Sequence, residues 1–180
     1  MASIYDTVSG WSSTVNYIKY NIVSGSNNKY YYSVINNNIG PGNDPIIASN
    51  LQVEWDGYIN VNNNLVPNFF WKPSYQTSIS LQPRIKIMKF GNGYQQRVPD
   101  GINTNLIDFD ANFENRKEPE AISILHFLNQ MNAQTSFVYN VPTIYNKTNF
   151  NTRFIAPSWT VNYNSYNNYT IKIKLQEVPV

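Results

Sequence analysis

The stretch Leu106–Glu114 alternates apolar and polar residues over its whole length. Because successive side chains of a β-strand point to opposite faces, this alternation separates the two kinds of residue onto two faces. The apolar face carries Ile107, Phe109, Ala111 and Phe113, and the polar face carries Asp108, Asp110, Asn112 and Glu114. The pattern predicts a strand in a sheet with one buried and one solvated face. The chain must therefore supply an element that covers one face of a sheet.

The segment that follows supplies this cover. Pro119 suits the first turn of a helix, and Glu118 and Glu120 suit the positive end of the helix dipole. Apolar residues then recur at helical spacing, at Ala121, Ile124, Leu125, Leu128 and Met131. The pattern predicts an amphipathic helix that ends near Asn132 and packs on the sheet. His126, the only histidine of the chain, is expected on the solvated side of this helix.

Further strands are predicted on both sides of the helix. Arg84–Phe90 alternates polar and apolar residues as a half-buried strand does, and the turn Gly91–Gly93 ends it. After the helix, strands are expected at Ser136–Tyr139, Thr152–Ala156 and Thr170–Val178. One helix among these strands predicts a mainly β fold, in which the helix covers a sheet or a β-sandwich.

The first 60 residues are predicted to form a small β module, because short apolar runs alternate there with turn signals. Its expected strands are Val15–Tyr20, Asn21–Ser24, Lys29–Asn36 and Leu51–Ile59. Residues 37–45 are an expected loop, and Val61–Asn64 is an expected linker. Residues 1–64 hold two basic and four acidic residues, against eleven and seven in the remainder. These differences predict two domains, 1–62 and 63–180.

The sequence carries no pattern of an enzyme. Cysteine is absent, which removes thiolate catalysis, disulfides and cysteine-bound zinc, and a lone histidine lacks the partners of a metal site or a triad. No glycine-rich phosphate loop, nucleophile elbow or HExxH pattern occurs. Asp108 and Asp110 lie about 7 Å apart by strand repeat, as paired glycosidase carboxylates do, but any strand with an acidic solvated face gives this spacing. We expect no catalytic residue, cofactor or metal.

The net charge of +2 is too small to indicate a nucleic-acid-binding protein. A local basic cluster, Arg84, Lys86, Lys89 and Arg97, suits an acidic neighbouring subunit or DNA phosphate, or serves only solubility and edge protection. No apolar run approaches the ~20 residues of a membrane span, and Met1–Asp6 lacks the features of a signal peptide. We expect a soluble protein without membrane insertion, assembled in a reducing cytoplasm.

One long motif, F-G-N-G-Y-Q-Q-R-V-P-D-G-I-N, runs from Phe90 to Asn103. It resembles the signature F-G-D/N-G-Y-x-Q-R-x-P-x-G-I/L-N of the phage minor tail protein M family, best known from lambda-like tails. A weaker similarity extends from Phe69–Pro73 to Lys174–Val178, over about residues 65–180. It keeps the family's order of strands, helix and strands.

The resemblance implies a distal-tail protein, with a tail-tube-like β-sandwich, one packed helix and no catalysis. Such a structural virion protein assembles with itself into a hexameric ring between the tail tube protein and the tip or baseplate hub proteins, and DNA only passes through the lumen. The motif residues would then form an assembly loop, with turns supplied by glycine and hydrogen bonds by Arg97. These residues are Phe90, Gly91, Gly93, Tyr94, Arg97, Pro99, Gly101 and Asn103. The other interpretation is that they only fix the domain's own turn.

Aromatic residues dominate the first segment. Tyr30 and Tyr32 alternate with Tyr31 on an expected strand, so at least one ring should be exposed and able to stack on a sugar or a protein. The segment is similar to the small modules of chitinase-type carbohydrate-binding proteins, which implies glycan-binding roles for Trp11, Tyr31 and Trp55. The alternative function is therefore an adhesin for host-surface polysaccharide, with the C-terminal domain as its anchor. The other interpretation assigns these rings to the module's core.

Overall fold

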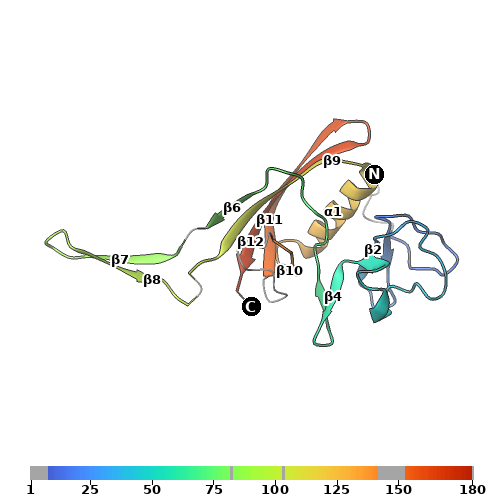
Figure 1. Cartoon of the computed structure of the whole chain (residues 1–180), viewed down its shortest axis with the longest axis horizontal. Coiled ribbons are helices and arrows are strands. Elements are labelled where there is room, and N and C mark those ends of the chain that lie inside the picture. Colours follow the sequence, from blue (N-terminus) through green and yellow to red (C-terminus); the bar gives the residue numbers. More distant parts are fainter. Residues whose placement is uncertain (1–7, 82, 103, 142–152, 180) are drawn as a thin grey trace.

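The structure, a computed structural model, describes residues 8–81, 83–102, 104–141 and 153–179. Its largest unit is an antiparallel five-stranded sheet with the strand order β10-β11-β12-β9-β6. These strands are β10 (Phe137–Val138), β11 (Arg153–Ser165), β12 (Asn168–Val178), β9 (Ile107–Arg116) and β6 (Ser78–Leu81). Helix α1 (Glu118–Met131) packs on one face of the sheet (Figure 1). The expected mainly β fold with one packed helix is confirmed.

The alternating apolar residues of β9 lie at the centre of the core. Its four predicted apolar residues are all buried, and the cross-strand neighbours of three of them on β12 are buried as well. The pairs are Phe113 with Ile171, Ala111 with Ile173 and Phe109 with Leu175. The second layer consists of α1 and the aromatic segment Phe69–Trp71, whose rings contact one another and Phe127 of the helix. Packing of large rings between helix and sheet is the main stabilising term of this domain.

The helix begins and ends where its sequence signals indicate. Its first backbone N–H, at Glu118, donates to Oδ1 of Asn167 at 2.7 Å, so the turn between β11 and β12 caps the helix. Its end is fixed by Asn132, which has a left-handed backbone and donates its N–H to the carbonyl of Leu128.

The prediction that His126 is solvated was wrong. This residue is 1 % exposed, and its Nδ1 lies 2.9 Å from the hydroxyl of Tyr32. Burial lowers the pKa of His126 to about 4. The physical reason is that the N-terminal module covers the side of α1 that faces away from the sheet, and helical periodicity within one segment does not reveal a second covering layer.

The N-terminal module contains a small antiparallel sheet of β1 (Ile22–Ser24), β2 (Tyr30–Ser33) and β3 (Trp55–Asp56), followed by a two-stranded hairpin. A short 3-10 helix, η1 (Ala48–Asn50), precedes β3. Its own core consists of Tyr17, Val23, Tyr31, Leu51 and Trp55. The expected strand Val15–Tyr20 is instead a series of turns, and the expected strand Leu51–Ile59 is broken at Gly57, whose φ is +111°.

The expected linker Val61–Asn64 is in fact the turn of that hairpin. Strands β4 (Tyr58–Val61) and β5 (Asn64–Pro67) pair across it. Asn62 and Asn63 both have positive φ, +50° and +63°, which is the backbone of a two-residue type I′ turn. Asparagine tolerates this conformation, so a run of asparagines marked a tight turn and not a flexible connection.

Candidate assembly interface

A two-stranded hairpin extends away from the sheet and forms a long arm (Figure 1). Its strands are β7 (Ile85–Lys89) and β8 (Gln95–Pro99), paired antiparallel from Ile85 opposite Pro99 to Lys89 opposite Gln95. From Ile85 to the tip at Asn92 the chain advances roughly 23 Å at the rise of a β-strand. We call residues 84–100 the arm.

The tip of the arm is a tight three-residue loop. The N–H of Phe90 donates to the carbonyl of Tyr94 at 2.9 Å, and the N–H of Gly93 donates to the carbonyl of Phe90 at 3.1 Å. Gly93 has a φ of +80°, the left-handed position that follows a type I turn in such loops. Gly91 lies in the turn as expected, but its φ is not positive.

The base of the arm is irregular because its return strand is longer than its outgoing strand. Two residues separate Leu81 from Arg84, whereas six separate Asp100 from Ile107. The N–H of Asp100 donates to the carbonyl of Arg84, and the N–H of Arg84 donates to the carbonyl of Thr104. The extra residues form a bulge that contains Gly101, with a φ of +95°. Ile102 in this bulge is 100 % exposed.

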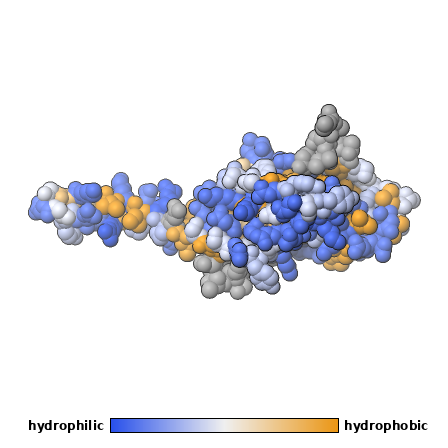
Figure 2. Space-filling view, turned by 90° about the horizontal axis from the view of Figure 1, so that it is seen from above, coloured by the Kyte–Doolittle hydropathy of each residue, from blue (hydrophilic) through white to orange (hydrophobic). Residues whose placement is uncertain are grey.

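The arm carries apolar side chains on both of its faces. Cross-strand register puts Ile85, Ile87 and Pro99 on one face and Met88, Phe90 and Val98 on the other. Phe90 and Tyr94 lie opposite each other at the tip, with ring centroids 5.8 Å apart. The prediction that Arg84–Phe90 is half-buried was wrong, because every residue of β7 is exposed. Figure 2 shows apolar and polar residues interspersed along the arm, clear of the body.

Burial of these side chains in an interface would contribute a large favourable free energy. Five large apolar residues of the arm are between 39 % and 68 % exposed: Ile85, Ile87, Met88, Phe90 and Tyr94. Covering the exposed half of each contributes about 1 kcal/mol, or about 5 kcal/mol for the set. A two-stranded hairpin alone is marginally stable in water. Sheet and helix do not contact the arm's outer part, so its favourable burial requires another surface.

Charge on the arm is mostly positive. Arg84 pairs with Asp100 at 3.3 Å, an exposed ion pair that contributes little stability. Lys86, Lys89 and Arg97 have no ion-pair partner in the described part of the chain. A surface that covers the arm would therefore combine apolar area with acidic groups.

The structure brings seven of the eight predicted assembly residues together. Phe90, Gly91, Gly93 and Tyr94 form the tip, Arg97 and Pro99 lie on β8, and Gly101 lies in the basal bulge. Asn103 lies outside the described residues. Ile85, Ile87, Met88 and Ile102 were not predicted as surface residues. For the three on β7, the available signal was apolar side chains on both faces of one strand, since a half-buried strand needs only one apolar face.

The three predicted glycan-binding aromatics do not form a common surface. Tyr31 and Trp55 are 0 % exposed, and only Trp11 is partly exposed. The indole of Trp55 donates to the carbonyl of Asn43 at 2.6 Å, and the hydroxyl of Tyr31 accepts from Nδ2 of Asn27 at 2.8 Å. Of the three tyrosines of β2, only Tyr30 keeps part of its surface exposed, because a module this small uses both faces of β2 for packing. The adhesin interpretation loses its physical basis at these rings.

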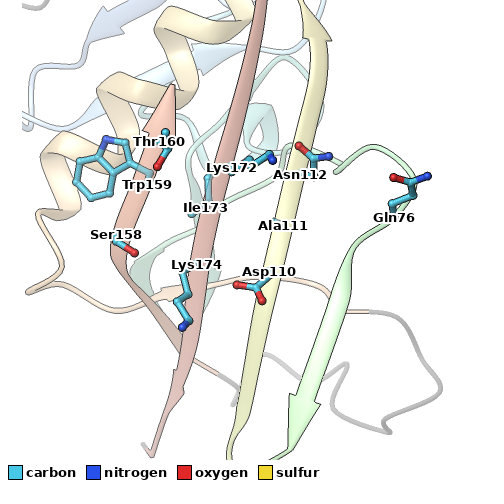
Figure 3. Close-up of a pocket in the computed structure, with 10 residues that line it drawn as sticks. All are labelled: Gln76, Asp110, Ala111, Asn112, Ser158, Trp159, Thr160, Lys172, Ile173 and Lys174. Carbon is cyan, nitrogen blue, oxygen red and sulfur yellow. The ribbon is translucent and has the colours of Figure 1, made fainter. Parts of the chain in front are cut away.

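The open face of the sheet has a shallow pocket of about 400 Å³, on the side away from α1 (Figure 3). Asp110 and Lys174, which point into it, occupy paired positions of β9 and β12. Asp110 is the only acidic residue that lines this pocket. The polar residues of β9 thus form a solvated face, and Asp108 is not among the described residues that line this pocket.

Among residues 8–81, 83–102, 104–141 and 153–179, no three acidic, histidine or cysteine side chains converge as metal ligands would. In the same residues, the helices are too short and too polar to cross a bilayer.

Comparison with known proteins agrees with the motif on the arm. The model of the phage minor tail protein family matches residues 67–179, which is more than half of the chain. Tail tip protein M of Escherichia phage lambda is 31 % identical over 74 residues, covering 41 % of this chain and 67 % of that protein. The match begins at Pro67, the last residue of β5, so almost all of the N-terminal module lies outside it. The chain belongs to the phage minor tail protein family and is a structural component of a bacteriophage tail.

Proposed function

We propose that this protein forms a hexameric ring at the tail tip, between the tail tube and the tip or baseplate hub, and that the arm binds the neighbouring subunit. The observation that carries the proposal is the arm, an exposed hairpin with apolar side chains on both faces. The similarity to a tail tip protein supports the location. The protein acts by assembly, without a catalytic step.

The geometry favours a contact between copies of one chain. The arm leaves the body, so its outer faces are out of reach of its own sheet (Figure 1). A contact between an arm and a different surface of the next copy is heterologous, and repetition of such a contact closes into a ring when the rotation per subunit permits. The basic side chains of the arm would select an acidic, partly apolar surface and fix the direction of docking.

Native mass spectrometry of the full-length protein and of a paired set of variants tests this proposal. Phe90→Ser with Tyr94→Ser removes two exposed rings from the tip of the arm. Tyr163→Ser with Tyr166→Ser removes two exposed rings from the turn end of the hairpin formed by β11 and β12, and is the matched control. We expect a hexamer for the wild type and the control, and monomers for the arm variant. A monomeric wild type, alone and with the tube protein, would refute the proposal, and so would an arm variant that assembles normally.

A further inference from the structure

A second cavity lies where the N-terminal module meets residues 67–179, the part of the chain that matches the family and that we call the family domain. It has a volume of about 290 Å³. The module contributes Lys19, Tyr20 and Val34, and the family domain contributes Phe70, Trp71, Lys72, Arg116 and Glu120. We call it the junction pocket. Because its module side lies outside the residues that match the family, the pocket is a feature of this chain and not of the family domain alone.

Arg116 is held firmly in this pocket but keeps one donor unused. Its Nη1 donates to Glu120 at 2.9 Å, and its Nη2 donates to the carbonyl of Lys72 at 2.8 Å. The Nε atom is buried and has no acceptor. Trp71 is 2 % exposed, and its Nε1 is a second buried donor without an acceptor. Both atoms are enclosed by the protein, so these donors lie beneath the lining of the cavity and are not exposed in it.

The pocket also carries positive charge that the protein leaves unpaired. Lys19 and Lys72 are exposed and have no ion-pair partner in the described part of the chain. Nζ of Lys19 lies 5.2 Å from the ring centroid of Tyr20. Arg116 and Glu120 neutralise each other. The two lysines therefore give the pocket a net positive charge, which favours an anionic ligand.

Aromatic rings form the rest of the lining. Phe70 stacks on Trp71, with ring centroids 4.0 Å apart and an interplanar angle of 26°, and Phe70 keeps part of its surface exposed. Tyr20 is half-buried, and burial together with the adjacent Glu120 carboxylate raises the pKa of Tyr20 to about 12. Tyr20 therefore stays a neutral hydroxyl. The lining combines aromatic rings, the ammonium groups of two lysines and a carboxylate acceptor.

We propose that the junction pocket binds an acidic saccharide, one pyranose unit that carries a carboxylate. Its C–H face would pack against the exposed parts of Phe70 and Tyr20, and its carboxylate would lie near Lys19 and Lys72. Glu120 would accept from a sugar hydroxyl. The cavity volume lies at the lower end of the range for small-molecule sites, which suits a single sugar unit better than a folded peptide segment.

This proposal is independent of the arm. It places a binding site at a position where the accessory module and the family domain line the same cavity. In a closed ring, many copies of a weak site would act together on a polymeric glycan. The site itself can be measured on the monomeric arm variant, so failure of the ring and failure of the pocket are distinguishable.

The test is a titration of the ¹⁵N-labelled full-length protein, monitored by nuclear magnetic resonance. The indole N–H signal of Trp71, assigned by its loss in Trp71→Phe, is the reporter. The probes are D-glucuronate, D-glucose and glutarate, which separate the acidic sugar from the neutral sugar and from a carboxylate without a sugar ring. Lys19→Glu with Lys72→Glu reverses both charges, and Lys172→Glu, on the open face of the sheet, is the control.

We expect D-glucuronate to shift the Trp71 signal with a dissociation constant about tenfold lower than that of either D-glucose or glutarate. The double lysine variant should weaken D-glucuronate binding about tenfold or more, and the control should leave it unchanged. Equal binding of glutarate and D-glucuronate would overturn the proposal in favour of an acidic peptide. No shift with any probe, or an equal loss in the control, would also overturn it.

Discussion

Asp56→Asn is expected to stabilise this protein at neutral pH. Oδ1 of Asp56 accepts from the N–H of Gly57 at 2.7 Å and from Nδ2 of Asn68 at 2.8 Å. Burial nevertheless outweighs these bonds and raises the pKa of Asp56 from 3.8 to about 6. Asparagine keeps an oxygen that accepts both hydrogen bonds, and it carries no charge to desolvate.

The size of the effect follows from linkage. A pKa raised by about two units corresponds to about 3 kcal/mol, at 1.36 kcal/mol per unit. Between pH 4 and pH 6 the folded state binds the proton more tightly than the unfolded state, so the contribution of Asp56 to stability falls as the pH rises through this window. Above pH 6 the full cost is present. Asp56→Asn removes it and should raise the free energy of unfolding by about 3 kcal/mol at pH 7.5.

Urea unfolding of both proteins at pH 7.5 and at pH 4 measures this difference. The monomeric arm variant serves as the background, so that assembly does not contribute to stability. We expect the gain at pH 7.5 to disappear almost completely at pH 4, where Asp56 of the folded protein is protonated. Asp108→Asn, on the open face of the sheet, is the control and should change the free energy of unfolding by about 0.5 kcal/mol or less. A gain that persists at pH 4, or no gain at pH 7.5, would refute the reasoning.

His126→Gln should make stability less sensitive to acid. Burial lowers the pKa of His126 from 6.5 to about 4, so as the pH drops through this window the unfolded chain binds the proton first. His126 therefore lowers the free energy of unfolding of the wild type at acidic pH. Urea unfolding at several pH values should show a shallower fall of this free energy in the variant, and an equal fall would contradict the prediction. Arg97→Ala should leave the free energy of unfolding within about 0.5 kcal/mol, because the side chain is exposed, but should raise the monomer fraction in native mass spectrometry; normal assembly would exclude its proposed role. Gly57→Ala should cost about 2 kcal/mol or more, because φ is +111° and a Cβ would lie 2.8 Å from Cδ2 of Tyr32, whereas Gly42→Ala meets nothing within 4 Å and is the control in thermal melts.

The elements predicted best are those whose structure is determined by sequence patterns within the element itself. The strict alternation of β9 and the capped, amphipathic pattern of α1 fix both the element and its buried face, because each pattern has only one way to bury its apolar residues. The tip of the arm was also predicted, since few residues other than glycine adopt the φ of Gly93 readily.

The failures concern burial by distant segments. An alternating strand is buried only if something covers it, and β7 lies beyond the edge of the body, so its pattern describes a surface that meets another molecule and not a core. The opposite error occurred at His126, which an N-terminal tyrosine covers from 94 residues away. Tyr31 and Trp55 follow the same rule, because a small module leaves few of its large rings unused.

The order of the strands in the sheet has a consequence for synthesis of the protein. Strand β12 lies at the centre of the sheet, between β11 and β9, although it follows both of them in the chain. Before β12 leaves the ribosome, β9 and β11 have no shared neighbour, and the turn that caps α1 through Asn167 is not yet closed. The apolar faces of the early strands therefore remain uncovered throughout translation of the segment that separates them. The complete sheet therefore forms only after its last strand has been made, and its apolar surface is open to aggregation until then.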